Sequence, residues 1–353
     1  MISKESTSRE WIDEIHHFKN TNHILVEKTI RALMLLEGLV ESDLDFVFKG
    51  GTSLVLLFNS TKRLSIDIDI IVPDKHKNIE DILPELCEKK EFLRYERIDR
   101  SPTSSIVKEH YKLYFMSAMS ETEDSVLLDV LKEEIHYSEV IEMPISNDFL
   151  KENGDPVTVL IPNFNNILGD KLTAFAPNTT GIPYRKGITE MGMEIIKQMY
   201  DIGCLFDKAD DMKSVSDVFF SFAETELKYR GNKKTIDDVL EDIIETSLAI
   251  CLEENYKSAD YAILNNGMTS IKTYIFSEKF HKEKAKIAAS KAAYLAFLIR
   301  HQIFKIERYD PTIDMKKWRI SGAKGEELTR LKRVSAESFY YIFKIFENKS
   351  SLS

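Results

Sequence analysis

The segment Arg63–Val72 reads RLSIDIDIIV and alternates between polar and aliphatic residues over its first eight positions. This period of two predicts a β-strand with one face in a hydrophobic core. Successive side chains of a strand point to opposite faces, so the polar residues share one face and the aliphatic residues share the other. The polar face comprises Arg63, Ser65, Asp67 and Asp69, and the aliphatic face comprises Leu64, Ile66, Ile68 and Ile70. The chain must therefore build a sheet around a strand that carries two neighbouring carboxylates.

Two explanations fit the carboxylates of Asp67 and Asp69, which lie about 6.5 to 7 Å apart at their Cα atoms from two rises of ~3.3 Å. The first is that they lie on the solvent face of an edge strand. The second is that they bind a cation, because like charges on one face repel and Asp is a poor strand former. Mg²⁺ takes one or two carboxylates together with substrate phosphates. We therefore expect a Mg²⁺ site here, with Mn²⁺ as the alternative ion.

A paired glycine, Gly50-Gly51, precedes this strand and is followed by Thr52 and Ser53. Glycines at a strand-to-helix turn let the backbone approach a ligand closely, and amide groups at a helix N-terminus attract anions. The four residues alone are also compatible with a simple turn and N-cap. Next to the Asp67–Asp69 strand, they predict a phosphate cradle that faces a metal site. The sequence contains no P-loop pattern.

The chain has 353 residues, which favours two domains. Strand patterns are confined to the first half and helical patterns fill the second, which predicts an α+β fold. We expect a small mixed sheet flanked by helices in residues 1–206 and an all-helical C-terminal domain in residues 207–353. The strands expected besides Arg63–Val72 are Asp45–Lys49, Glu109–Ala118 and Ser125–Lys132. The expected helices are Trp11–Val40, Leu54–Phe58, Ile79–Lys90, Asn166–Ala176, Thr189–Phe206, Ser214–Lys228, Ile236–Leu252, Tyr256–Phe276, Lys282–Phe304 and Glu326–Glu347.

The net charge of −10 argues against a protein covered in basic surface, although two local basic runs occur, Lys279–Lys291 and Met315–Val334. Each is explained by a solvated helix face or by a nucleic-acid-binding patch. The eight histidines form no metal-binding spacing, which makes a zinc site unlikely in the sequence pattern. No apolar run reaches the length of a membrane span and the first residues lack a signal-peptide pattern, so we expect a cytoplasmic protein.

The order of these motifs resembles a known family. A strand, Gly50-Gly51-Thr52-Ser53, a short helix and then Arg63-x-Ser65-x-Asp67-x-Asp69 is similar to the N-terminal signature of the AbiEii/AbiGii-type nucleotidyltransferases. That family is a MenT-like toxin branch of the DNA polymerase β-like nucleotidyltransferase superfamily. The resemblance covers roughly residues 25 to 206.

The resemblance implies further site residues. Asp129, alone in the apolar run SVLLDVLK, matches the third acid of the superfamily, or else is a polar residue on an exposed strand face. Lys171 in LGDKLTAFA matches a family lysine, and Asp201 in KQMYDIGCLF matches a later family acid. Asp201 also stands four residues after Lys197, the spacing of a helix-surface ion pair. Roles for Arg185 and Lys186 and for the C-terminal helices do not follow from the pattern.

Together, the residues and the resemblance imply a Mg²⁺-dependent nucleotidyltransferase toxin that uses an NTP and releases pyrophosphate. Its acceptor would be a hydroxyl, with a tRNA 3′ end favoured. It would act in a toxin–antitoxin or abortive-infection system, restrained by a cognate antitoxin encoded nearby. The alternatives are transfer to a small molecule or a protein, or nucleotide binding without catalysis. The implied metal ligands are Asp67, Asp69 and Asp129. The implied catalytic residues are these three acids with Lys171 and Asp201, and the implied nucleotide-binding residues are Gly50, Gly51, Thr52, Ser53, Arg63, Ser65 and Lys171.

Overall fold

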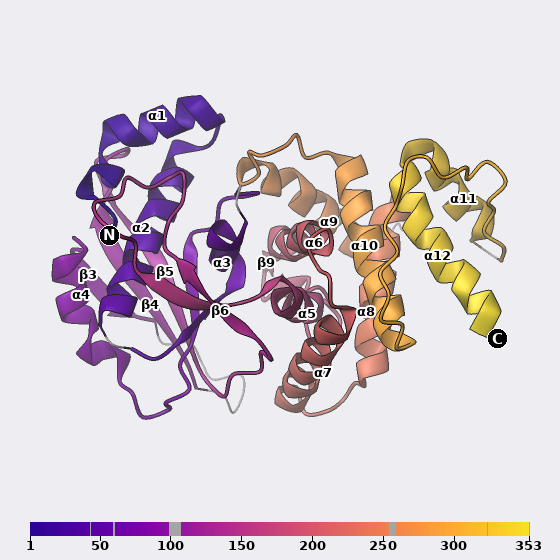
Figure 1. Ribbon diagram of the computed structural model, residues 1–353, viewed down its shortest axis with the longest axis horizontal. Helices are drawn as coiled ribbons and strands as arrows, with labels where there is room; N and C mark the ends of the chain where they lie inside the picture. The colour runs from indigo at the N-terminus through magenta and orange to yellow at the C-terminus, as the bar shows by residue number, and fades with distance from the viewer. Residues whose placement is uncertain (43, 59–60, 99–106, 254–258, 323, 353) are drawn as a thin grey trace. The chain divides into compact units, whose positions relative to one another are not determined.

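The computed structural model describes residues 1–42, 44–58, 61–98, 107–253, 259–322 and 324–352 (Figure 1). The chain divides into two compact units. Unit 1 comprises Met1–Asn163 together with Thr273–Lys279, and unit 2 comprises Phe164–Lys272 together with Phe280–Ser353. The expected α+β class, with a small mixed sheet, flanking helices and a helical C-terminal region, is confirmed.

Unit 1 is built on a five-stranded mixed sheet. Its strands β2 and β5 run parallel, and the other three neighbouring pairs are antiparallel. In spatial order the strands are β1 (Val47–Lys49), β2 (Asp67–Ile71), β5 (Glu123–Lys132), β4 (Val107–Met116) and β3 (Arg94–Arg97).

Helix α2 (His23–Glu41) covers one face of this sheet (Figure 1). Its Arg31 guanidinium lies 5.1 Å from the centroid of the Phe115 ring on β4, which identifies the covered face. That face is the hydrophobic core of the unit, because its side chains are almost completely buried. They include Phe48, Ile68, Ile70, Leu128, Val130, Tyr111 and Leu113. Of the predicted aliphatic face, Leu64, Ile68 and Ile70 are buried and Ile66 is partly exposed. Asp67 and Asp69 of β2 lie on the opposite side of the sheet.

The remaining elements of unit 1 surround the sheet. The helical ones are η1 (Lys4–Thr7), α1 (Arg9–Lys19), α3 (Gly50–Leu57), η2 (Ile79–Asp81) and α4 (Leu83–Lys89). A separate antiparallel pair, β6 (Val140–Pro144) and β7 (Thr158–Pro162), packs with β7 beside β1.

In the described residues of unit 2, the regular structure is helical apart from one pair of strands of two residues each. Helix α10 (Lys282–Arg300) packs against α6, α8 and α12, and every residue from Ala288 to Ile299 is buried, as expected for a helix inside a bundle. The other helices are α5 (Phe164–Ala174), α6 (Gly192–Phe206), α7 (Met212–Tyr229), α8 (Ile236–Leu252), α9 (Ala259–Ser270), α11 (Gly325–Val334) and α12 (Ala336–Leu352). The strands are β8 (Arg185–Lys186) and β9 (Thr189–Glu190), and η4 (Ile271–Thr273) ends the segment that returns to unit 1. Among the described residues, no helix is both long and apolar enough to cross a membrane.

Two of the long predicted helices are each split. Asn20, with a φ of 51°, ends α1, and the Asn22 side chain accepts a hydrogen bond from the Leu25 amide at 3.1 Å to begin α2. Ser335 adopts an extended conformation between α11 and α12, and its hydroxyl accepts from the Ser338 amide at 3.3 Å. Local caps at polar residues therefore override a continuous apolar period.

Other boundaries also shift. Strands β3, β6 and β7 were not predicted, and residues 189–190 form β9 instead of helix. The predicted helix Tyr256–Phe276 begins at residues 256–258, outside the described residues, and α9 ends at Ser270. Helices α5 and α6, expected within residues 1–206, group with unit 2. The division at 206/207 stays a prediction about the extent of the functional domains.

Candidate active site

Four residues from four adjacent strands form one row across the sheet of unit 1. Asp69 of β2 is the register partner of Lys49 of β1 and of Asp129 of β5. Asp129 is in turn the register partner of His110 of β4. Register partners project their side chains to the same face, and Asp67 shares that face because it lies two residues before Asp69. The fold therefore gathers the three predicted acids of unit 1 on the face opposite the core.

The paired glycine packs directly against the acidic strand. Gly50 has a φ of +80°, the left-handed region that favours glycine, and a Cβ atom there would lie 2.1 Å from Asp69 Oδ2. A Cβ atom on Gly51 would lie 2.7 Å from an Arg63 guanidinium nitrogen and 2.8 Å from the Ser65 hydroxyl. Gly50 is thus favoured both by its backbone conformation and by its contact with Asp69, and Gly51 lies close to the side-chain ends of Arg63 and Ser65. The predicted juxtaposition of this turn with Asp69, Arg63 and Ser65 is present in unit 1.

The hydroxyls of Thr52 and Ser53 are buried and donate to backbone carbonyls. Thr52 Oγ1 donates to the Asp67 carbonyl at 2.5 Å, and Ser53 Oγ donates to the Gly50 carbonyl at 2.9 Å. Thr52 therefore fastens α3 to the first acidic residue of β2, and Ser53 closes the first turn of α3. These contacts give both hydroxyls a positioning function, and their predicted contact with phosphate stays a prediction.

A distant segment completes the strand that leads into Asp67. The Leu64 amide donates to the Tyr274 carbonyl at 2.9 Å, and Arg63 forms an isolated antiparallel bridge with Ile275. The regular strand consequently begins at Asp67 rather than at Arg63. Arg63 is 7% exposed, and its guanidinium donates to the Leu64 carbonyl at 3.0 Å. Residues 273–276 were expected to end a helix, and Tyr274 and Ile275 instead pair with the residues that lead into Asp67.

His110 is a site residue that the sequence reasoning missed. Its Nδ1 lies 2.7 Å from Asp129 Oδ1, and the Asp129 side chain is one-third exposed. The contact orients the Asp129 carboxylate while leaving it accessible to solvent. Strand alternation within Glu109–Ala118 places His110 on one face, but only the register with Asp129 identifies it, and register is not visible in one sequence.

The donor chemistry of this row suits a hard divalent cation. Asp67 and Asp69 offer carboxylate oxygens on one face, and Gly50 brings α3 close to Asp69. Within the described part of the chain, no group of three or more His, Cys, Asp or Glu side chains is already gathered as a metal site. The predicted metal set, Asp67 and Asp69 with Asp129 next to Asp69, stays a prediction.

Unit 2 contains the other two predicted catalytic residues, and they contact each other. Lys171 Nζ of α5 lies 3.0 Å from Asp201 Oδ2 of α6 and donates to Gln198 Oε1 at 2.9 Å. The side chains of Lys171 and Asp201 are 7% and 2% exposed. Lys197, the alternative partner suggested by spacing, pairs with Glu194 at 3.0 Å. The two residues thus form a buried, hydrogen-bonded ion pair, and their role in catalysis stays a prediction.

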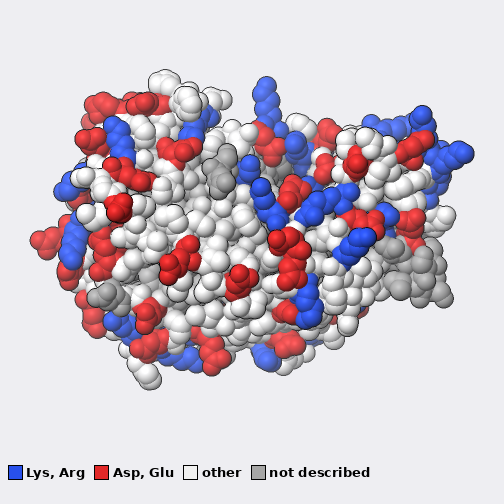
Figure 2. Space-filling model, viewed as in Figure 1, with Lys and Arg blue, Asp and Glu red and all other residues white. Residues whose placement is uncertain are grey.

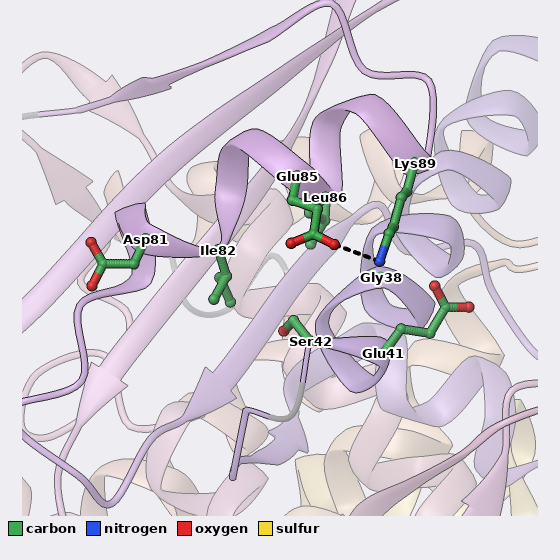
Figure 3. A pocket seen from close by; sticks show the side chains of 8 residues that line it. All are labelled: Gly38, Glu41, Ser42, Asp81, Ile82, Glu85, Leu86 and Lys89. Atoms are coloured by element: carbon green, nitrogen blue, oxygen red, sulfur yellow. Dashed lines mark ion pairs between the residues drawn. The ribbon is translucent and has the colours of Figure 1, made fainter.

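A cavity of about 230 Å³ is lined by residues of α2, η2 and α4 and by nearby residues (Figure 3). None of the predicted site residues lines it. Its charged groups include Glu85 and Lys89, which pair with each other at 2.7 Å, and Glu41, which pairs with Lys90. The complete lining is Gly38, Glu41, Ser42, Asp81, Ile82, Glu85, Leu86 and Lys89. The cavity therefore shares no lining residue with the row of Lys49, Asp69, Asp129 and His110.

The sequence model of one protein family, described as "Nucleotidyl transferase AbiEii toxin, Type IV TA system", matches residues 34–300. The match includes most of the chain and contains all five predicted catalytic residues, Asp67, Asp69, Asp129, Lys171 and Asp201. The chain belongs to the AbiEii family. It is thus a nucleotidyltransferase, and membership in a type IV toxin–antitoxin family implies an NTP substrate and an antitoxin partner. The resemblance found in the sequence motifs is confirmed.

Solved structures give more distant likenesses to this AbiEii-family chain. JHP933 from Helicobacter pylori has 13% identity and a TM-score of 0.42, over 80% of this chain and 94% of its own. A second Helicobacter pylori protein, described as a nucleotidyltransferase, has 15% identity and a TM-score of 0.42, over 80% and 97%. A nucleotidyltransferase-like protein from Paracoccidioides brasiliensis has 14% identity and a TM-score of 0.37, over 58% and 89%. A direct search of curated proteins gives no match. The assignment to the AbiEii family rests on the family match alone.

Proposed function

We propose that this nucleotidyltransferase transfers a nucleotide from a Mg²⁺-bound NTP to a hydroxyl of RNA, with the 3′ end of tRNA as the favoured acceptor. The transfer would be the toxic activity, and the antitoxin would restrain it. Both substrates occur in the cytoplasm, so we place the activity there. The observation that carries the proposal is the packing of Gly50 and Gly51 against Asp69, Arg63 and Ser65.

This packing supports nucleotidyl transfer because it brings groups that bind anions next to groups that bind cations. A triphosphate needs cations and amide donors, and a divalent cation needs carboxylates. Helix α3 begins at Gly50, so its first amide groups lie at the turn that contacts the acidic strand. Arg63 supplies a fixed positive charge at the same turn, next to Gly51. The described side chains thus offer both kinds of contact within one small region of unit 1.

The reaction proceeds in the proposal by in-line displacement. The acceptor hydroxyl oxygen forms a bond to the α-phosphorus, the bond from the α-phosphorus to the bridging oxygen breaks, and pyrophosphate leaves. In this proposal Asp129 accepts the hydroxyl proton or would serve as a third metal ligand, and the contact with His110 orients its carboxylate. Mg²⁺, when held by Asp67 and Asp69, supplies positive charge against the phosphate oxygens. The protein contributes mainly position and charge.

Lys171 has a proposed role in offsetting the charge of the leaving pyrophosphate, taken from the family resemblance. Its ammonium group is held by Asp201 and Gln198, which fix its direction. A lysine that is buried and fixed in this way loses little further freedom when it binds an anion. Asp201 therefore acts in the proposal by positioning Lys171.

The experiment incubates the purified protein and Mg²⁺ with each α-labelled NTP and, separately, with total tRNA, with cell protein and with a small-molecule extract. We expect label in the tRNA fraction for wild type and none for Asp67→Asn. The matched control is Asp148→Asn, because Asp148 belongs to the same unit and its side chain is 73% exposed. That control should retain transfer.

The other outcomes separate the alternatives. Label in the protein or small-molecule fraction, and none in tRNA, would refute the RNA acceptor and keep the nucleotidyltransferase chemistry. Tight NTP binding with no transfer to any fraction would favour a binding module. Transfer that persists in Asp67→Asn and after chelation by EDTA would contradict the metal-binding role of the acidic strand.

A further inference from the structure

The two basic runs of the C-terminal half have different structural roles. The lysine-rich run at the start of α10 is used inside unit 2. Lys286 pairs with Glu253 at 2.8 Å and is 8% exposed, and Lys291 pairs with Asp207 at 2.7 Å and is 6% exposed. Two of the five lysines of this run are thus buried in ion pairs, while Lys279, Lys282 and Lys284 are exposed.

The second run, Met315–Val334, presents its charge to solvent. It contains seven Lys or Arg residues and two Glu residues, a net charge of +5 in a chain of net charge −10. Figure 2 shows Lys and Arg side chains gathered over the part of unit 2 where α11 lies. The exposed basic residues are Lys316, Lys317, Arg319, Lys324, Arg330 and Arg333. We call these six residues the α11 basic surface.

The backbone beneath this surface is fixed by buried contacts. Lys332 is the one basic residue of the run that is of intermediate exposure. It donates to the Met315 carbonyl at 2.6 Å and to the Trp318 carbonyl at 2.8 Å. The Trp318 ring stacks on Phe343 of α12 at 4.4 Å between centroids. Thr329 accepts from the Ile320 amide at 3.0 Å. The loop before α11 is therefore held against both α11 and α12, and its lysines project from a rigid base.

The acids of the run do little to cancel this charge. Glu326 pairs with Arg330 at 2.8 Å, but the two side chains are 85% and 71% exposed. Such exposed ion pairs contribute little to stability, and salt screens the attraction between their charges. Lysine and arginine contacts to phosphates give affinity without reading sequence.

We propose that the α11 basic surface binds the phosphate backbone of the RNA acceptor. This inference rests on the proposed function for its partner, and it assigns the C-terminal helices a role in holding the RNA rather than in chemistry. An acidic protein is the competing partner class. RNA fits better because the six cations lie exposed in the loop before α11 and on α11 itself, and contacts to a phosphate backbone need charge without a matched set of partner side chains.

The test is a binding titration that needs no NTP. The probe is a 5′-fluorescein RNA hairpin with a single-stranded 3′ end, measured by fluorescence anisotropy from 50 to 300 mM salt. The variant Lys316→Gln, Lys317→Gln, Arg333→Gln removes three exposed charges. The matched control, Lys228→Gln, Lys233→Gln, Lys234→Gln, removes three exposed charges from another part of unit 2.

We expect the control to bind like wild type. If each of the three residues neutralises one phosphate, the slope of log affinity against log salt becomes shallower by about 2, and affinity falls up to ~100-fold at 0.1 M salt. Transfer to RNA should then show a raised KM for RNA with kcat little changed. Circular dichroism and the denaturation midpoint check that the variant is folded.

Three results would overturn the inference. The first is equal affinity and equal salt slope in the variant, its control and wild type. The second is equal loss in the variant and its control. The third is displacement of the RNA by polyglutamate at equal charge concentration, which would indicate an acidic protein as the partner. The Asp67→Asn variant separates this inference from the proposed function, because it should bind the hairpin normally and transfer nothing. Normal hairpin binding at this surface with no RNA labelling by wild type would refute the RNA acceptor alone.

Discussion

Replacing Gly50 by alanine should disable transfer by moving one carboxylate. The added Cβ atom would lie 2.1 Å from Asp69 Oδ2, 2.8 Å from its Cγ and 3.0 Å from its Cβ. Side-chain Cβ atoms essentially never approach heavy atoms closer than 3.0 Å, so the Asp69 carboxylate, or α3, must retreat by about 1 Å. The displaced group is the carboxylate next to Asp129 in the row across the sheet.

Two costs to stability add in this variant. Alanine in the left-handed region, at a φ of +80°, costs about 1–2 kcal/mol. Overpacking against Asp69 adds about 1–3 kcal/mol. A misplacement of about 1 Å at a reacting centre can lower the rate by about 100-fold. We therefore expect a loss of roughly 2–5 kcal/mol in stability together with a loss of about 100-fold or more in transfer rate.

Gly154 provides a matched control for the backbone cost. Its φ is +82°, and a Cβ atom there would meet nothing within 4 Å. Gly154→Ala should show the backbone cost of about 1–2 kcal/mol and retain full activity. The difference between the two variants then isolates the contact with Asp69.

The assay combines urea denaturation of both variants with initial rates of label transfer at saturating NTP. Temperatures well below the denaturation midpoint keep both proteins folded. A Gly50→Ala protein that transfers at the wild-type rate would refute the placement of Asp69 in the reaction. Equal losses of activity in Gly50→Ala and Gly154→Ala would show that strain, not the carboxylate, explains the effect.

Three further predictions concern other parts of the molecule. Asp201→Leu alone should lower the free energy of unfolding by about 3–5 kcal/mol because it leaves the Lys171 ammonium buried without its partner. The double variant Lys171→Met, Asp201→Leu should recover stability in denaturation but not transfer activity. A fully active double variant would contradict the catalytic role of Lys171. His110→Ala should lower activity about 10–100-fold through loss of the contact that orients Asp129, with an unchanged denaturation midpoint, and His110→Asn should recover part of it; unaltered kinetics would exclude this positioning role. Desolvation raises the pKa of Glu253, but hydrogen bonds from two lysines outweigh this effect and leave the pKa lowered. The stabilising effect of Glu253 is therefore present above the unfolded pKa of about 4.3 and is lost as pH falls through the lower folded pKa. Glu253→Gln should reduce the urea midpoint at pH 7, and its difference from wild type should shrink as pH falls below about 4.

The alternation of Arg63–Val72 was enough to predict which side of the sheet is buried. Ile68 and Ile70 are completely or almost completely buried, while Asp67 and Asp69 lie on the other face with the glycine turn. Periodicity could do this because a strand has only two faces, and hydrophobic burial selects one. The fold class and the family followed from the same segment and its neighbours.

Features that depend on long-range pairing were not predictable from this sequence. The alignment of Asp69 with Asp129, and of Asp129 with His110, is a matter of register between strands far apart in the chain. The bridge between Arg63 and Ile275 joins segments more than 200 residues apart. The periodicity of one segment does not reveal which distant segment it pairs with or in which register. The ion pair of Lys171 with Asp201 was accessible only as a family resemblance, because the spacing rule favoured Lys197.

The internal use of the α10 lysines is a second limit of sequence reasoning. Lys286 and Lys291 lie in a run that reads as a solvated or RNA-binding face, yet both are buried against acids from other helices. A charge pattern in one segment does not reveal which acids the fold brings to it. The burial of these two lysines is what distinguishes them from the six exposed residues of the α11 basic surface.

The most direct test of nucleotidyl transfer compares two labels in one reaction. The purified protein is incubated with Mg²⁺ and total tRNA, and with the same NTP labelled either at the α-phosphate or at the γ-phosphate. The account predicts that α-label enters the RNA, that γ-label leaves as pyrophosphate, and that Asp69→Asn abolishes both. Entry of γ-label into any acceptor without α-label, or equal transfer by Asp69→Asn, would contradict it.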